Sequence, residues 1–168
     1  MIKLARAQLA EMRCHAERVY PHECCGLLIG QITDDGRTRL IAETYPVENE
    51  FDRAALSDAF ADSEATQAQA VPAAAGEDRH RRMLIPPQAY LRAERLYAAR
   101  GLGVVGNYHS HPEHPAVPSQ FDLAHLAPWP TMSYIVVSVR AGKAAELRSW
   151  ELAADGARFN EEEIVEGA

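Results

Sequence analysis

Apolar residues recur along the chain with two spacings, and these spacings predict its helices and strands. From Leu4 to Tyr20 the spacing is near-helical and charged residues fill the gaps, which predicts an amphipathic helix that Pro21 ends. A second helix is predicted to begin at the Pro-Pro pair 86–87 and to end at Gly101. The faces predicted to be buried are Leu9, Met12, Ala16 and Val19 on the first helix and Tyr90, Ala93, Leu96 and Tyr97 on the second.

Shorter apolar runs, rich in β-branched residues, predict strands between and after these helices. The predicted strands are 24–29, 39–44, 104–108, 134–139, 147–152 and 158–165, with a short helix from Gln120 to about Ala127. This alternation predicts an α/β fold, a central mixed β-sheet flanked by helices. A length of 168 residues with 47% apolar content suits a single domain over residues 1–168.

Composition and charge change this picture in three places. Residues of about 54–82 are dominated by Ala, Asp, Gln and Glu without a lasting apolar stripe, which predicts a flexible insertion that ends in a basic, solvated loop edge, 79–82. The net charge of −7 argues against unaided binding to nucleic acid or to an anionic membrane. No apolar run approaches a membrane span and no signal sequence is recognised, so a cytoplasmic protein is expected.

The three cysteines are odd in number and do not indicate a secreted disulfide framework. Cys24 and Cys25 are adjacent, so on a strand their side chains point to opposite faces and make a poor zinc pair. They are interpreted as small buried hydrophobic residues.

Candidate chemistry gathers where the strand 104–108 ends. His109 and His111 follow at i and i+2, a spacing that places both imidazoles on one side of an extended chain. Asp122 comes eleven residues later, three after Ser119. Ser-x-x-Asp is also the pattern of a helix capping box, so a purely structural role stays open for this pair. Two imidazoles and a carboxylate leave the open position that a catalytic zinc site needs.

The complete pattern resembles the JAMM (MPN-plus) metallopeptidase family. Glu23 lies far upstream in Pro21-His22-Glu23-Cys24-Cys25-Gly26-Leu27-Leu28-Ile29-Gly30, and the later elements are His109, His111, Pro112, Ser119 and Asp122. The run Glu-Cys-Cys-Gly-Leu-Leu-Ile-Gly resembles the compact bacterial branch. The resemblance implies a cytidine-deaminase-like fold and Zn²⁺ held by His109, His111 and Asp122. It also implies Glu23 as the general base that activates a zinc-bound water, and Ser119 as a hydrogen-bond donor to the oxyanion.

The resemblance further implies a peptidase or isopeptidase that cuts after the C-terminal Gly-Gly of a ubiquitin-like protein. For the compact bacterial branch the expected partner is a sulfur-carrier protein of the ubiquitin fold, and the insertion could help to hold it. Nucleic-acid and membrane partners are not expected, and the oligomeric state, including a homodimer, is left open.

Two other functional classes stay open. One is a non-catalytic MPN-type protein-binding module, although such modules usually lack the metal ligands. The other is a non-haem iron oxygenase, because two His and one carboxylate also form a facial triad. His114 and His125 lie near the motif without a part in it, and His125, one turn beyond Asp122, is a candidate for contact with a ligand.

Overall fold

The computed structural model describes residues 1–51, 82–126 and 131–167. Most of the predicted insertion, which includes His80, therefore lies outside the described residues. Along the chain the elements are β1 (Ile2–Ala5), α1 (Arg6–Val19), β2 (Cys25–Ile32), β3 (Arg39–Val47), α3 (Pro87–Tyr97), η1 (Ala98–Arg100), β4 (Gly103–Pro112), α4 (Gln120–Leu126), β5 (Ser133–Arg140), β6 (Lys143–Leu152), β7 (Phe159–Glu162) and β8 (Ile164–Gly167).

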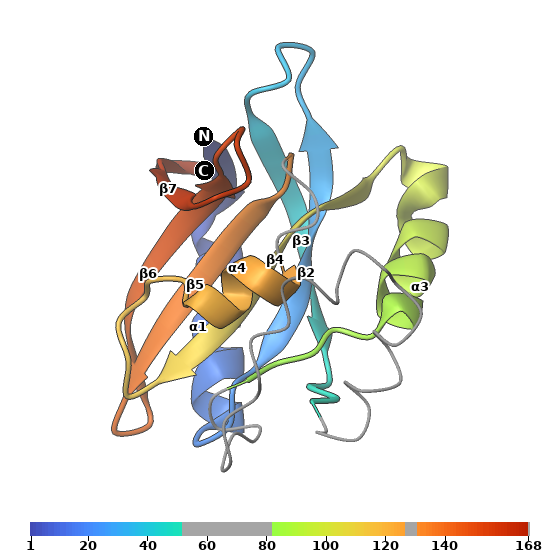
Figure 1. The fold of residues 1–168 in the computed structure, drawn as a ribbon. Helices are drawn as coiled ribbons and strands as arrows, with labels where there is room; N and C mark the ends of the chain where they lie inside the picture. The colour runs from blue at the N-terminus through green and yellow to red at the C-terminus, as the bar shows by residue number, and fades with distance from the viewer. Residues whose placement is uncertain (52–81, 127–130, 168) are drawn as a thin grey trace, which may run out of the picture.

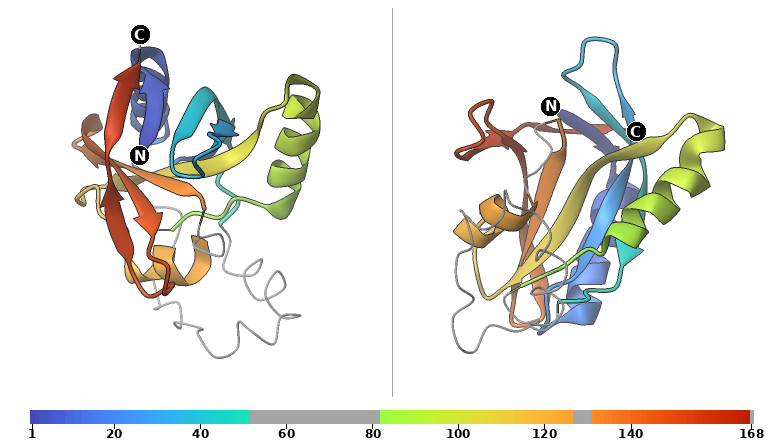
Figure 2. Two further views of the ribbon diagram at one scale, coloured as in Figure 1. Left: turned by 90° about the horizontal axis from the view of Figure 1, so that it is seen from above. Right: turned by 45° about the vertical axis from the view of Figure 1, so that its right-hand side comes forward.

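Eight strands of the described chain form one mixed sheet with helices on both faces (Figure 1), which confirms the predicted fold class. The strand order is β7-β6-β5-β4-β2-β3-β1-β8. Helix α1 covers one face, and α3 and α4 lie on the other, as the views in Figure 2 show. Each face has its own apolar core. Cys25, Leu27 and Ile29 of β2 belong to the core under α3, whereas Cys24 and Leu28 belong to the core under α1.

This alternation confirms that Cys24 and Cys25 are buried on opposite faces, and all three cysteines are free thiols. The sequence of a central strand that is buried on both faces is a continuous apolar run, and residues 24–29 have such a sequence. No helix among the described residues has the length and apolar character needed to cross a membrane.

The centre of the sheet sets the register that the functional residues follow. β2 pairs antiparallel with β4, with Cys25 opposite His109. The pairing continues one residue further, because the Ser110 N–H donates to the Cys24 carbonyl at 3.1 Å and the Cys24 N–H donates to Ser110 Oγ at 2.8 Å. One more step in this register places Glu23 opposite His111.

The first residues depart from the sequence prediction. A helix was expected from Leu4, but β1 precedes it and α1 begins at Arg6. The burial of Ile2 and Leu4, at 0% and 2% exposure, and parallel pairing with both β3 and β8 outweigh the helical pattern. The prediction failed because these partners are distant in sequence.

The last residues also differ from the prediction of one strand over 158–165. They form β7 and β8, which are separated only by Glu163 yet lie at opposite ends of the strand order. β7 pairs with β6, and β8 pairs with β1. The sheet therefore curves until its two edges are joined by consecutive residues.

On α3, the buried residues are Ala89, Ala93 and Tyr97, which recur every four positions. Leu96 was predicted to belong to this face, but it is 61% exposed. It lies one residue away from the buried stripe, so its side chain points to solvent.

Candidate metal centre

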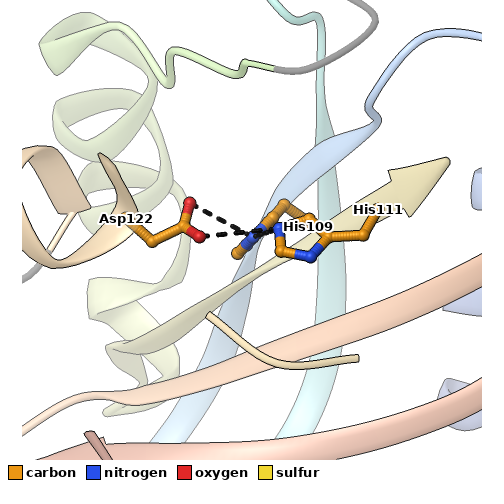
Figure 3. Close-up of side chains that lie close together, drawn as sticks. All are labelled: His109, His111 and Asp122. Atoms are coloured by element: carbon orange, nitrogen blue, oxygen red, sulfur yellow. Dashed lines mark hydrogen bonds and ion pairs between the residues drawn. The ribbon is translucent and has the colours of Figure 1, made fainter. Parts of the chain in front are cut away.

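His109 and His111 on β4 and Asp122 on α4 bring their side chains to one point in the protein interior (Figure 3). All three are buried. The distance between His109 Nε2 and His111 Nε2 is 3.0 Å. Asp122 Oδ1 lies 3.4 Å from His109 Nε2, and Asp122 Oδ2 lies 3.5 Å from His111 Nε2.

These separations fit a zinc ion. Zinc ligands at about 2.0–2.1 Å from a tetrahedral ion lie about 3.3 Å from one another. His111 Nδ1 is 3.1 Å from the Pro115 carbonyl, so Nδ1–H donates there and the Nε2 lone pair faces the other two side chains. The donor set of two imidazoles and one carboxylate is also one that zinc accepts. The residues present could therefore hold such an ion.

Burial and the mutual charges of the three side chains shift their pKa values in different directions. Burial lowers the pKa of His109 more than the adjacent carboxylate raises it, which favours the neutral imidazole that a metal requires. Burial also lowers the pKa of His111, but the hydrogen bond and charge of Asp122 raise it above its ordinary value. Although burial opposes it, the two imidazoles hold the pKa of Asp122 well below its usual range.

The loop between β4 and α4 is anchored to the neighbouring strands, and this fixes where α4 begins. Ser138 Oγ on β5 donates to the His114 carbonyl at 2.6 Å, and Trp150 Nε1 on β6 donates to the Ala116 carbonyl at 3.0 Å. The Glu113 N–H donates to the Val139 carbonyl at 2.7 Å. Asp122 therefore returns to the histidines on a braced segment.

Ser119 and Asp122 form the capping box that their spacing allowed. The Ser119 N–H donates to Asp122 Oδ2 at 2.5 Å, and the Asp122 N–H donates to Ser119 Oγ at 3.2 Å. The same carboxylate faces both histidines, so the helix cap is compatible with a metal site at this carboxylate. The cap fixes the carboxylate that completes the site.

Glu23 lies beside this cluster at the wall of a cavity of about 300 Å³. The residues that line the cavity are Glu23, Arg82, His111, His114, Pro115, Val117 and Ser119. Glu23 is 5% exposed, and burial, aided by the charge of Asp122, raises its pKa to about 8 against the opposing effects of His111 and Arg82. A carboxyl group with this pKa can take up and release a proton near neutral pH.

Two residues of this region were not identified from the sequence. Asn49 Nδ2 donates to the Glu23 carbonyl and to the Arg82 carbonyl, both at 2.9 Å, and its Oδ1 accepts the N–H groups of Phe51 and Leu84 at 3.0 and 3.1 Å. Asn49 thus joins three separate segments next to the cavity. No motif marks it, because its partners are defined only by the fold.

Arg82 was predicted to lie at a solvated loop edge, and this was wrong. It is half-buried, it lines the cavity, and its guanidinium carbon is 4.4 Å from the centre of the Phe121 ring. A cation that packs on an aromatic ring loses part of its exposure to solvent and is held in place.

The other histidines are placed as follows. His114 is exposed and lines the cavity, while the side chain of His125 lies outside the described residues, so its predicted contact is untested. His15 is buried, and its Nδ1 is 2.9 Å from the Tyr108 hydroxyl on the α1 face of the sheet. His22 is exposed.

Comparisons with known proteins identify the family and the fold. Residues 5–153 match the family described as prokaryotic homologs of the JAB domain. A solution structure from Salinibacter ruber is 34% identical with a TM-score of 0.66, covering 99% of this chain and 92% of its own. One from Desulfitobacterium hafniense is 28% identical with a TM-score of 0.72, covering 99% of this chain and 93% of its own.

A JAB1/MPN domain protein from Archaeoglobus fulgidus is 16% identical with a TM-score of 0.51, and the match covers 98% of this chain and 95% of that one. This likeness concerns the fold alone. No functionally curated protein matches the chain. Because the family match spans most of the sequence, the chain belongs to the prokaryotic homologs of the JAB domain.

Proposed function

We propose that this protein is a zinc-dependent peptidase that hydrolyses the bond after the C-terminal Gly-Gly of a ubiquitin-like protein. The observation that carries the proposal is the convergence of His109 Nε2, His111 Nε2 and the Asp122 carboxylate at zinc-like separations, with Glu23 in the adjoining cavity. A purely structural cluster would not need a buried acid with a raised pKa beside it.

The roles of the chain's own groups follow from their positions. When bound, a zinc ion would supply a Lewis acid that acidifies a coordinated water and polarises a carbonyl. Glu23 takes the proton from the attacking water and later gives it to the leaving amine. Its raised pKa, about 8 in the metal-free chain, suits a group that must hold a proton between these steps.

Ser119 supports the developing oxyanion. Its Oγ accepts the Asp122 N–H, so the hydroxyl hydrogen remains to be donated toward the cavity that Ser119 lines. A positioned donor of this kind stabilises charge that appears only in the transition state.

The substrate proposal rests on the size of the cavity and on the family resemblance. A volume of about 300 Å³ is at the lower end for ligand sites, so it admits the end of a chain rather than a folded surface. Two glycines let a backbone enter a narrow channel because they carry no Cβ. The proposed partner is a sulfur-carrier protein of the ubiquitin fold, in which cleavage exposes the Gly-Gly end.

The test incubates zinc-loaded protein with ubiquitin-like proteins from its own source, each extended beyond Gly-Gly, and follows the products by mass spectrometry. Cleavage directly after the second glycine is expected, and Glu23→Gln should retain zinc but lose nearly all turnover, because Gln cannot accept a proton. Tight binding of an uncleaved partner would instead identify a non-catalytic module. Iron content with substrate-dependent oxygen uptake would identify an oxygenase.

A further inference from the structure

Asn107 on β4 is a buried polar side chain that the proposed chemistry does not use. It is 0% exposed, and its neighbours in the sheet, Leu27 on β2 and Tyr134 on β5, both belong to the apolar core under α3. Neither polar atom of its amide reaches hydrogen-bond geometry with a described residue. Buried amides in proteins are paired with protein groups or with ordered water, because an unpaired one is costly.

The orientation of this amide follows from its effect on Tyr90 of α3. Burial raises the pKa of Tyr90 to about 12, and Asn107 opposes that shift. An opposing effect of this kind comes from a hydrogen donor, so the nitrogen end of the amide faces the Tyr90 oxygen. The carbonyl oxygen, Oδ1, therefore points away from Tyr90 and needs a donor of its own.

The next side chain on this face of β4 is His109, which has an unpaired ring nitrogen. Its Nε2 faces His111 Nε2 and the Asp122 carboxylate (Figure 3), so Nε2 is the atom placed to bind a metal. In a metal-bound neutral imidazole the other nitrogen, Nδ1, carries the hydrogen. Nδ1 of His109 is buried and makes no hydrogen bond within the described part of the chain, whereas His111 Nδ1 has the Pro115 carbonyl at 3.1 Å.

Among the sheet neighbours of His109, Asn107 is the one with an unused acceptor. The residues beside His109 are Cys25 on β2 and Val136 on β5, and the Cys25 thiol already donates to the Val47 carbonyl. Valine offers no polar atom. Side chains at i and i+2 of a strand start about 6.8 Å apart. One water with two hydrogen bonds of about 2.8 Å each bridges a gap of this size.

We propose that Asn107 is a positioning residue of the metal centre, and that its Oδ1 holds the Nδ1–H of His109 through one buried water. This inference rests on the metal site of the proposed function. The water accepts the imidazole hydrogen and donates one of its own to Oδ1. The ring is thereby held in the orientation and tautomer that aim the Nε2 lone pair at the metal.

The test compares the zinc affinity of Asn107→Val and Asn107→Thr, which have the same shape and differ in one hydroxyl. Both residues suit a buried strand, so both variants should fold, as melting temperatures of the metal-free proteins will show. The zinc dissociation constant of Asn107→Val should rise about 10- to 100-fold, the effect of losing the outer partner of a metal-binding histidine. Asn107→Thr can still bind the water and should recover part of this affinity. Competition with a chromophoric chelator measures the constants.

Ser133→Ala is the matched control. Ser133 is also 0% exposed with an unpaired Oγ among the described residues, but it precedes Tyr134 and points to the other face of the sheet. Loss of this hydroxyl should leave zinc affinity unchanged.

A spectroscopic signature tests the link to His109 itself. In zinc-loaded protein the Nδ1–H signal is observed by ¹H–¹⁵N NMR and is assigned to His109 by its loss in His109→Gln. Wild type should show a hydrogen-bonded, downfield proton with a cross-peak to a bound water. In Asn107→Val this proton should move upfield, and in Asn107→Thr it should return toward the wild-type position.

The outcomes separate this inference from the proposed function. Wild-type zinc affinity in Asn107→Val, or an unchanged Nδ1–H signal, overturns the inference and leaves the peptidase standing. Equal losses of affinity in the Val and Thr variants, or a similar loss in Ser133→Ala, would assign the effect to packing and overturn it as well. If affinities and signals follow the expected order but no extended ubiquitin-like protein is cut, the positioning role stands and the peptidase does not.

Discussion

At the scale of single residues, the Asp122 carboxylate serves two purposes with the same atoms. It caps α4 through the Ser119 N–H, and it faces both histidines. A carboxylate has several lone pairs, so the same aspartate can both cap a helix and face two imidazoles. The Ser-x-x-Asp pattern is therefore consistent with both roles. The cap also restricts the rotamer of Asp122, which prepares it for a metal.

The two purposes can be separated by comparing Asp122→Asn with Asp122→Ala. Both should weaken zinc binding by more than about 100-fold, because even the loss of an outer partner of a ligand costs up to that factor. The amide oxygen of Asn can still accept the Ser119 N–H, so the metal-free Ala variant should be less stable than the Asn variant by about 1 kcal/mol.

Metal titration and urea unfolding of metal-free protein measure these two effects. Asp34→Asn, at an exposed turn, is the control for the loss of one charge. Undiminished zinc affinity in both Asp122 variants would contradict the ligand assignment.

Asn49 should behave as a positioning residue. Asn49→Ala leaves two carbonyls and two N–H groups near the cavity without their partner, so we expect a loss of about 2–4 kcal/mol in unfolding free energy. Because Glu23 and Arg82 lose their common anchor, kcat should fall while the zinc content stays at the wild-type level. Kinetics and metal analysis against the exposed control Asn160→Ala test this; a loss of zinc instead would mean that Asn49 supports the ligands.

At the scale of elements, α1 is joined to β4 by a polar contact inside an apolar core. His15 packs edge-on against Tyr108, with ring centres 5.9 Å apart, and its Nδ1 contacts the hydroxyl. Burial, with a smaller effect of Arg18, lowers the pKa of His15 to about 4. Gly26 on the neighbouring strand has no side chain because a Cβ there would overlap the Tyr108 ring.

This contact predicts a pH dependence of stability. The folded pKa of about 4 lies below the ordinary value of 6.5, so between these values the unfolded chain binds more protons. Stability contributed by neutral His15 is therefore complete above pH 6.5 and is lost as the pH falls toward 4. Each pKa unit corresponds to 1.36 kcal/mol, and the partly solvated ring reduces the total loss to about 2 kcal/mol.

Unfolding free energies measured from pH 7 to pH 4 test the direction and the magnitude of this stability loss. His15→Gln keeps a polar partner for Tyr108 but cannot titrate, so its stability should fall less steeply than that of wild type. His22→Gln replaces an exposed histidine and serves as the control. Parallel curves for wild type and His15→Gln would refute the assignment.

At the scale of the whole molecule, the sequence predicted what depends on neighbours in the chain and missed what depends on closure of the sheet. Periodicity located the central strands, and the i, i+2 spacing located the two histidines, because both are local properties. β1 was missed, and β8 was merged with β7 in one predicted strand, because each is four residues long and pairs with partners distant in sequence. Asn49 and Arg82 were missed for the same reason, as their roles arise from contacts across the fold.

The closure of the sheet depends on a buried cation, Arg39, which is 5% exposed. It donates to Glu162 at 3.0 Å, to Glu151 at 3.3 Å and twice to the Thr131 carbonyl. Glu162 also accepts a hydrogen bond from Ser149 and lies 3.4 Å from the N-terminal ammonium group. The network therefore links β3 to β6 and β7, which lie on the far side of the strand order.

Arg39→Met should lower the unfolding free energy by about 3–5 kcal/mol, because it leaves the Glu162 carboxylate buried, with the N-terminal ammonium group as the remaining cation beside it among the described residues. The double variant Arg39→Met/Glu162→Gln should recover part of this loss, since the amide carries no charge that needs a partner. Arg158→Met, at an exposed turn, should change stability by less than about 0.5 kcal/mol. Urea unfolding of wild type and of these three variants measures the differences in unfolding free energy. A double variant no more stable than Arg39→Met would show that the cost comes from lost packing of the arginine stem, and the sheet would then be closed by strand pairing alone.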